Sequence, residues 1–260
     1  MRIYFIKHKK QVRENYLKFL KSLKYRLHPN PVRNTGCTDL EIDKWIVSEF
    51  LLDRLVPIIG VHPFPLDELI LLTAAVVSFR PSHVFEWGTH LGKSARAFHE
   101  ISKAFDLAVE IHSVDLPDDA VHGEHPREKR GRYARKIPSI RLHQGDGLDT
   151  SLRIYEREKS RIRLPLFFLD GDHSYESVKR ELHGIRSAVP NAVLLVHDTF
   201  YQSRESGYNT GPHRAINEMM DDIPGDYSLL STFLGLPGMT LLFPRNRAPR
   251  TEGPHPDPWK

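Results

Sequence analysis

The sequence contains a single cysteine, Cys37, among 260 residues. One cysteine excludes an internal disulfide framework and any zinc site built from several cysteines, and it fits a reducing compartment. Long apolar runs are also missing, because no stretch approaches the roughly 20 residues that a membrane-spanning helix needs. Lysines at positions 7, 9 and 10 interrupt the apolar start before the core of a secretory signal could form. We therefore expect a soluble cytoplasmic protein that is not exported.

Positive charge is concentrated at one end of the chain. The formal net charge is only +4, yet residues 1–30 hold nine Lys or Arg and a single acid, Glu14. Tyr16, Leu17 and Leu20 recur there at roughly helical spacing, which predicts a basic amphipathic helix. It either lies solvated on the body of the protein or contacts an anionic membrane surface or acceptor. The mild overall charge gives no reason to expect a nucleic-acid partner, and self-association into a homo-oligomer stays open.

The middle of the chain alternates apolar strands with helices. A hydrophobic content of 40% is enough for one globular core. Near-continuous apolar strands separated by helices are typical of a parallel sheet covered on both faces. We predict an α/β fold with a basic helical extension over residues 1–60, the main domain over 61–245 and a disordered tail over 246–260. Predicted helices cover residues 66–79, a segment from Lys93, 175–189 and 213–220; predicted strands cover 83–88, 109–115, 140–146, 164–172 and 192–199, and an edge hairpin covers 227–233 and 239–244.

Acidic residues lie at or beside the carboxyl ends of five predicted strands. In open parallel sheets, ligands bind beyond these strand ends. We therefore expect one crevice that gathers five acids, namely Glu86, Asp115, Asp146, Asp170 and Asp198.

The stretch FEWGTHLGKS, residues 85–94, ends like a phosphate-binding loop. Such a loop needs four residues between its first glycine and Gly-Lys-Ser, whereas Gly88 leaves only three, and Trp87 stands where that glycine should be. Glu86 would also repel polyphosphate. LPLFFLD nevertheless imitates the magnesium-binding strand of ATPases, so a P-loop-like nucleotide phosphotransferase remains an alternative. Lys93 receives no chemical role.

The pattern E-x-G-x-x-x-G-x-S over residues 86–94 resembles the first motif of class I S-adenosylmethionine-dependent methyltransferases, particularly O-methyltransferases. The resemblance implies a Rossmann-like fold with a mostly parallel seven-stranded sheet and an antiparallel C-terminal edge hairpin. It implies that Asp115 binds the ribose hydroxyls, for which a carboxylate offers two parallel acceptors. The residues implied to contact this cofactor are Glu86, Gly88, Thr89, Gly92, Ser94, Asp115, Gly145, Asp146 and Asp170.

The sequence segments FLDGDHSYESVKREL and VLLVHDT, within residues 168–199, resemble the family-24 methyltransferases. That group includes macrocin-type sugar O-methyltransferases and cephalosporin-hydroxylase-like proteins, and the likeness covers about residues 65–244. By similarity to cation-dependent O-methyltransferases, Asp170 falls on a metal ligand and His173 on the catalytic base. His197 and Asp198 fall on the remaining ligands, so the resemblance implies a divalent Mg²⁺ or Mn²⁺ at Asp170, His197 and Asp198.

His197 departs from the relatives, which have an acid at that position. An Asp/His/Asp set carries less charge than the all-oxygen sites that Mg²⁺ prefers, and it accepts Mn²⁺, Fe²⁺ or Zn²⁺ more readily. Two interpretations stay open. In one, a metal lowers the pKa of the acceptor hydroxyl and His173 removes the proton. In the other, no metal binds and His197 is the base. Either histidine could also be a structural residue at a strand end.

Two further segments are candidates for acceptor contacts. Residues 126–136 hold six basic residues and one acid, which indicates a solvated helix or a mobile lid over an anionic acceptor. Residues 200–214 are rich in glycine and aromatic side chains, and Tyr201, Tyr208 and His213 could touch the acceptor.

These observations predict an O-methyltransferase that moves a methyl group from S-adenosylmethionine to a hydroxyl of a sugar or other small natural product, with metal assistance. The alternatives are the phosphotransferase and a non-methylating protein on the same fold, either cephalosporin-hydroxylase-like or partner-binding.

Overall fold

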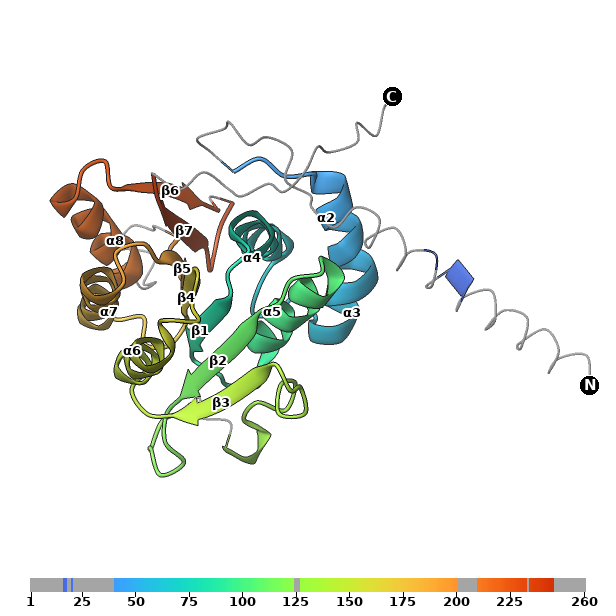
Figure 1. Cartoon of the computed structure of the whole chain (residues 1–260), viewed down its shortest axis with the longest axis horizontal. Coiled ribbons are helices and arrows are strands. Elements are labelled where there is room, and N and C mark those ends of the chain that lie inside the picture. Colours follow the sequence, from blue (N-terminus) through green and yellow to red (C-terminus); the bar gives the residue numbers. More distant parts are fainter. Residues whose placement is uncertain are drawn as a thin grey trace, which may run out of the picture.

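The protein is built around one seven-stranded sheet (Figure 1). The computed structural model describes residues 16, 17, 20, 40–123, 127–200, 210–232 and 234–245. The strands follow the order β3-β2-β1-β4-β5-β7-β6; β3 to β5 run parallel, and β7 pairs antiparallel with both β5 and β6. The predicted mostly parallel sheet with an antiparallel edge hairpin is thus confirmed. The strands are β1 (His83–Trp87), β2 (Glu110–Asp115), β3 (Ile140–Gln144), β4 (Pro165–Leu169), β5 (Val193–His197), β6 (Tyr227–Ser231) and β7 (Met239–Pro244).

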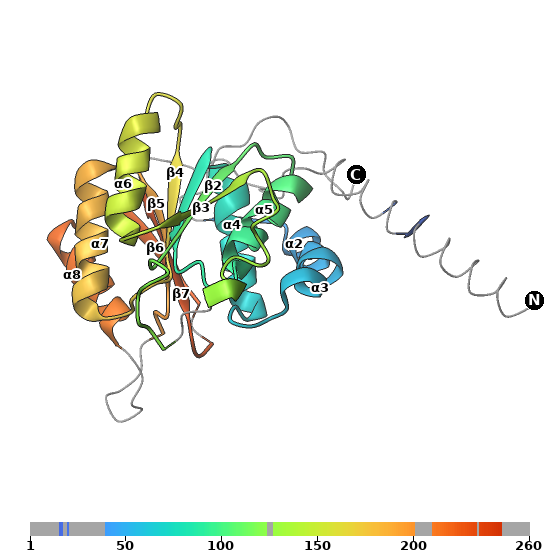
Figure 2. The same cartoon turned by 90° about the horizontal axis from the view of Figure 1, so that it is seen from below.

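Helices cover both faces of the sheet, with α4 and α5 on one face and α6, α7 and α8 on the other (Figure 2). Local sequence sets where they begin: Asp43, Asp146 and Ser174 each cap a helix by accepting a backbone N–H. Among the described residues, no helix combines the length and apolar character needed to cross a bilayer. The helices are α2 (Lys44–Phe50), the π-helix η1 (Leu51–Leu55), α3 (Val56–Ile59), α4 (Leu66–Phe79), α5 (Lys93–Ala104), the 3₁₀ helix η2 (Arg127–Lys129), α6 (Gly147–Glu158), α7 (Tyr175–Ala188) and α8 (Gly211–Asp222).

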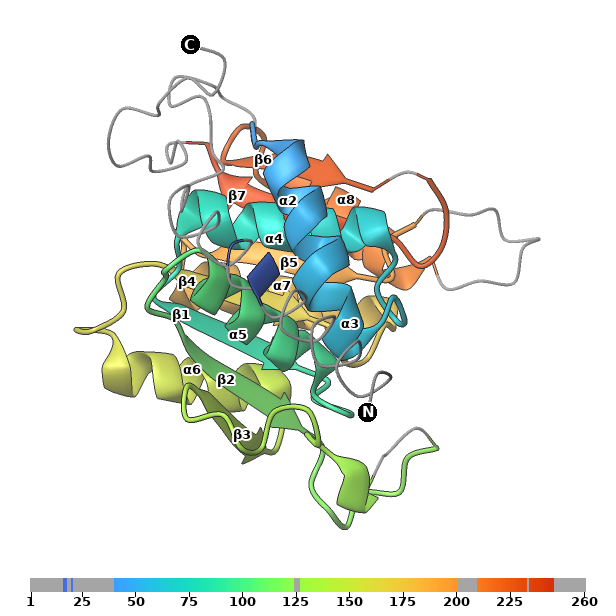
Figure 3. The ribbon, with the colours of Figure 1, turned by 90° about the vertical axis from the view of Figure 1, so that its right-hand side faces the viewer.

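The segment α2-η1-α3 packs on the outside of α4 and α5 (Figure 3). Val47, Phe50 and Leu55 are fully or almost fully buried in the same hydrophobic cluster as those helices, and the ring of Phe50 meets that of Phe105 edge to face at 5.2 Å. Residues 43–59 therefore belong to the main core. The basic helix predicted from Tyr16 onward and the C-terminal tail lie almost entirely outside the described residues.

The basic segment 126–136 is not the helix that we predicted. The described part forms only η2 and a run of turns. Its backbone bonds to the glycine loop instead: Gly131 N donates to His90 O at 2.7 Å, and Tyr133 N donates to Leu91 O at 3.1 Å. Gly131 has a φ of +62°, which a regular helix does not accommodate.

Glu68 is a buried acid in the first turn of α4, only 1% exposed. Its carboxylate accepts hydrogen bonds from His197 Nε2 at 3.0 Å and from Gly238 N at 2.7 Å. It therefore joins α4 to the end of β5 and to the turn before β7.

Glu86 is a second buried acid, also 1% exposed, and lies within β1. Ser113 Oγ on β2 donates to Glu86 Oε1 at 2.6 Å, and Ser113 Oγ also lies 2.6 Å from Thr89 Oγ1. Burial raises the pKa of Glu86 to about 7 despite the Ser113 hydrogen bond. Glu86 therefore connects the two central strands beneath the glycine loop.

Replacing Glu68 by Gln is expected to lower the free energy of unfolding by about 3 kcal/mol, because His197 loses a buried carboxylate partner. Urea unfolding checks this value. The control is Asp67→Asn on the same helical turn, where a change below about 1 kcal/mol is expected from the helix dipole. Equal effects of the two substitutions would contradict a special role for the buried pair.

The pKa of Glu86 predicts a pH-dependent stability. A carboxyl whose pKa rises from 4.5 to about 7 on folding stabilises the fold below pH 4.5 and loses that contribution as the pH passes 7. Glu86→Gln should therefore gain about 3 kcal/mol relative to wild type between pH 4.5 and pH 8. Urea unfolding across this range measures the gain, and the exposed Glu176→Gln is the control. If the free energy of unfolding of Glu86→Gln changed with pH in parallel with that of the wild type, a raised pKa of Glu86 would be refuted.

Candidate functional site

A large cleft opens at the carboxyl ends of the parallel strands. Four of the five predicted strand-end acids line it, but Glu86 does not, because its side chain turns inward beneath the loop. A smaller hollow beside Pro190 and Tyr227 is lined by no histidine and only one acid. Residues lining the large cleft include Trp87, Gly88, Thr89, His90, Ser94, Asp115, Gly145, Asp146, Asp170, His173, His197 and Asp198.

The glycine loop is shaped by two left-handed residues. Gly88 has a φ of +92°, and a Cβ there would lie 1.9 Å from the backbone oxygen of Asp170, so only glycine fits. Gly92 has a φ of +78° and caps α5, which starts at Lys93 as predicted. Lys93 Nζ donates to the backbone oxygen of His62 at 2.5 Å. This hydrogen bond to the backbone agrees with the expectation that Lys93 has no catalytic role.

Asp115 ends β2 at one side of the cleft. Its Oδ2 accepts His90 N at 3.0 Å, its Oδ1 accepts Leu116 N at 2.9 Å, and Arg130 Nε lies 3.4 Å from Oδ2. A carboxylate has about four acceptor positions, so capacity remains for hydroxyl donors. These contacts fix its orientation beside the glycine loop.

Asp146 and Gly145 form the adjoining wall. Asp146 Oδ1 caps α6 by accepting Asp149 N at 2.9 Å, and Arg180 donates to Oδ2 at 2.5 Å. Burial opposes the charge, but these hydrogen bonds hold the pKa of Asp146 below its usual range. Gly147 packs so tightly that an added Cβ would lie 2.4 Å from the Trp87 ring. The predicted adenine-side residues thus also build the start of α6.

His197 lies between two carboxylates at the base of the cleft. Its side chain is 5% exposed, with Nδ1 2.8 Å from Asp170 Oδ1 and Nε2 3.0 Å from Glu68 Oε2. Burial alone would lower the pKa of His197, but the charges and hydrogen bonds of Asp170 and Glu68 raise it to about 10. At neutral pH both ring nitrogens carry protons and donate. This imidazolium is poorly suited to be a general base.

His173 is the more accessible histidine, with 26% of its side chain exposed. It follows β4, and its Nε2 lies 3.2 Å from Asp198 Oδ2 and 3.9 Å from Asp170 Oδ1. Asp198 follows β5 in a turn with a φ of +57°. Asp tolerates this left-handed conformation better than most residues do. The turn after β5 thus presents a carboxylate to His173, an arrangement that can orient a general base.

The three predicted metal ligands do not form a preassembled site. A ligating imidazole needs one deprotonated nitrogen, whereas both nitrogens of His197 face carboxylates. Asp198 Oδ1 lies 3.8 Å from His197 Nδ1. Within the described ranges, the only group of three or more His, Cys, Asp or Glu ligand atoms that all lie within 4.8 Å of one another is elsewhere. To bind a metal together with Asp170, His197 would therefore have to give up its 2.8 Å contact with Asp170 Oδ1.

Sequence reasoning missed three residues that shape this site. Glu68 and Arg130 hold His197 and Asp115, respectively, and Trp87 packs against Gly147 and Gly171 below the cleft. The available signal for Glu68 was a pair of acids, Asp67 and Glu68, at the start of the mostly apolar stretch LDELILLTAAVVSF.

Of the three predicted acceptor contacts, only His213 lies among the described residues. Tyr201 and Tyr208 lie outside the described residues. His213 lies on α8, where Nε2 is 2.9 Å from Asn217 Nδ2, and burial lowers the pKa of His213. It is not among the side chains that line the cleft.

Comparison with known proteins agrees with this architecture. Residues 85–199 match a family model described as a methyltransferase domain. A rhamnosyl O-methyltransferase of Mycobacterium bovis is 28% identical over 153 residues, which are 57% of this chain. Counterparts of the same name in Mycobacterium tuberculosis give the same values. The chain spans 59% of the length of these curated relatives.

Two solved structures share the fold. The calicheamicin methyltransferase CalS11 gives a TM-score of 0.50 at 16% identity and covers 75% of this chain and 85% of its own. An O-methyltransferase from Bacillus cereus in complex with SAH gives a TM-score of 0.50 at 16% identity, covering 76% and 90%. Residues 85–199 are thus similar to a methyltransferase domain, and the chain has the class I methyltransferase fold of these solved structures.

Proposed function

We propose that this protein is an S-adenosylmethionine-dependent O-methyltransferase whose acceptor is a hydroxyl of a sugar or another small molecule. The observation that supports it best is the cleft at the strand ends, where the glycine loop and Asp115 face His173 and Asp198. The curated relatives are named for methylation of a rhamnosyl group, which supports a sugar hydroxyl.

The residues of the glycine-loop side fit the cofactor. Thr89 and Gly88 would hold its amino-acid end, Asp115 its ribose hydroxyls, and the Gly145-Asp146 turn its adenine. Asp115 is already aligned by His90 N and keeps acceptor capacity. The bound cofactor supplies an electrophilic methyl group on a sulfonium, so the protein's main task is positioning.

His173 is the proposed base. A hydroxyl must lose its proton as it attacks, and His173 can take that proton at Nδ1, because its Nε2 faces the Asp198 carboxylate and carries the ring's own proton. Histidine is the side chain that most often serves as a general base in enzymes. Asp198 then stabilises the imidazolium that forms, 3.2 Å away. His197 does not take part in proton transfer, because each of its two ring nitrogens donates to a carboxylate, Nδ1 to Asp170 and Nε2 to Glu68.

Metal assistance, which the resemblance implied, is not part of this mechanism. His197 would have to release a proton that two carboxylates hold, and Asp170 would have to give up its 2.8 Å contact. The charged histidine already occupies the position where a cation would balance Asp170. We therefore expect turnover without added Mg²⁺ or Mn²⁺.

Cofactor binding separates the methyltransferase from the phosphotransferase alternative. Calorimetry should detect S-adenosylmethionine and S-adenosylhomocysteine but not ATP. Asp115→Asn should weaken the affinity for S-adenosylmethionine and for S-adenosylhomocysteine by at least about tenfold, because a charged hydrogen-bond acceptor is lost. Lys93→Ala is the matched control and should leave both affinities unchanged. Tight ATP binding that Lys93→Ala abolishes, with no response to S-adenosylmethionine, would overturn the proposal.

His173→Gln is expected to lower kcat for methyl transfer by about 10²- to 10³-fold, with little change in affinity for S-adenosylmethionine. Transfer of a radiolabelled methyl group to a panel of rhamnosyl and other sugar acceptors measures it. His183→Gln on α7, away from the cleft, is the control and should keep wild-type turnover.

A different outcome would assign the base elsewhere. If His173→Gln retained wild-type kcat while added Mn²⁺ stimulated turnover and Asp170→Asn abolished that stimulation, the metal-dependent mechanism would replace the one proposed.

A further inference from the structure

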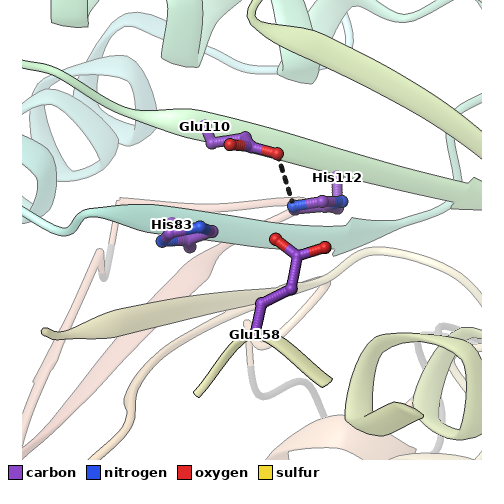
Figure 4. Close-up of side chains that lie close together, drawn as sticks. All are labelled: His83, Glu110, His112 and Glu158. Atoms are coloured by element: carbon purple, nitrogen blue, oxygen red, sulfur yellow. Dashed lines mark ion pairs between the residues drawn. The ribbon is translucent and has the colours of Figure 1, made fainter. Parts of the chain in front are cut away.

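A second group of titratable side chains lies at the other end of the sheet from the cleft (Figure 4). His83 begins β1 and Glu110 begins β2, so both stand at the amino ends of strands whose carboxyl ends form the cleft. His112 lies two residues after Glu110, and Glu158 is the last residue of α6. None of these four residues has a place in the proposed reaction.

The fold brings these four side chains together on one face. Glu110 and His112 are two residues apart on a strand and therefore point to the same side of the sheet. His83 is the register partner of Glu110 on the neighbouring parallel strand. The helix α6 covers this face and ends above it, which places Glu158 next to the two histidines, as Figure 4 shows.

The ligand atoms already approach the spacing of a metal site. One nitrogen or carboxylate oxygen from each of the four residues lies within 4.8 Å of all the others. In tetrahedral zinc coordination with bonds of about 2.0–2.1 Å, neighbouring ligand atoms are about 3.3 Å apart. His112 Nε2 and Glu110 Oε1 are 3.4 Å apart, close to that value. The other pairs need to close by at most about 1.5 Å, within the reach of side-chain adjustment.

The two histidines each leave one buried nitrogen without a hydrogen bond. His83 is 4% exposed and His112 is 0% exposed, and among the described residues neither Nε2 has a hydrogen-bond partner. Their other nitrogens are held: His83 Nδ1 lies 3.0 Å from Ser82 Oγ, and His112 Nδ1 lies 3.1 Å from His143 Nε2. Ligating histidines typically have one nitrogen fixed by a neighbour and the other directed at the metal.

The carboxylates have competing partners at the surface. Arg141 Nε lies 2.7 Å from Glu110 Oε1, and Arg157 donates to Glu158 Oε1 at 2.8 Å. Arg161 lies 3.6–3.7 Å from both acids. These arginine side chains are 51–66% exposed, so they can turn into solvent, and Glu158 Oε2 has no hydrogen bond. A purely ion-paired cluster would leave the buried Nε2 of His83 unsatisfied, at a cost of about 1–3 kcal/mol, and would give His112 Nε2 only the 3.4 Å contact with Glu110.

We propose that His83, His112, Glu158 and Glu110 form a structural binding site for Zn²⁺. Two nitrogen and two oxygen donors favour zinc over Mg²⁺ and Ca²⁺, which prefer oxygen alone. Burial disfavours protonated imidazole, and the neutral ring is the form that binds metal. The ion ties the starts of β1 and β2 to the end of α6. It lies outside the cleft, so its binding does not depend on the proposed methyl transfer.

The test uses the full chain, freed of metal with a chelator and titrated with ZnCl₂ by calorimetry. One site per chain with micromolar or tighter affinity is expected, and zinc should raise the melting temperature reversibly. Co²⁺ should give the visible absorption of a tetrahedral site. His112→Gln and the more peripheral Glu158→Gln should each weaken binding by at least about 100-fold, while circular dichroism confirms that they fold.

Two further variants sharpen the test. His99→Gln is the matched control, because His99 is a half-buried histidine on α5 that contacts Ser139 and should not alter zinc affinity. Arg141→Gln removes a competitor for Glu110 and should tighten zinc binding by about fivefold. Absence of a stoichiometric site in wild type, or unchanged affinity in both His112→Gln and Glu158→Gln, would overturn the proposal.

Discussion

The cleft depends on a row of three charged side chains, the buried Glu68 and His197 and the partly exposed Asp170. They come from α4, the end of β5 and the residue after β4, and the imidazole is within 3.0 Å of both carboxylates. None of these charges can lose its partner inside the core without a large penalty. The row therefore fixes how two strand ends and a helix meet, and His173 and Asp198 lie on the loops above as the groups to which we assign the chemistry.

Local patterns made the sheet predictable, because the apolar strands, the apolar stretch of α4 and the helical repeat of α7 are visible within a few residues. Topology then placed Asp115, Asp170 and Asp198 at one edge. The partners of these groups were not predictable: Glu68 is 129 positions from His197. Glu86 was misplaced because it lies one residue inside β1, and a shift of one residue turns a side chain to the opposite face.

The glycine loop shows why a short motif needs its surroundings. Gly88 is required by the backbone oxygen of Asp170, which belongs to the neighbouring strand's loop and not to a ligand. The segment around Gly131 closes over the loop through hydrogen bonds to His90 and Leu91. Its basic residues suggested a solvated helix, but the backbone N–H groups of Gly131 and Tyr133 donate to the glycine loop instead. Arg130 consequently lies against Asp115, where it limits and orients the carboxylate.

Histidines at the two ends of the sheet differ in a way that assigns their chemistry. At the carboxyl end, both nitrogens of His197 face carboxylates, so the ring itself supplies the positive charge that the acids require. At the amino end, His83 and His112 each hold one nitrogen with a neighbour and keep the other buried without a hydrogen bond. In the proposed mechanism the first place needs no added cation, and the second is the place where we propose that zinc binds. Residue types alone do not separate these two sites, because both contain histidines beside acids. The number of ring nitrogens that already have a hydrogen-bonding partner does separate them.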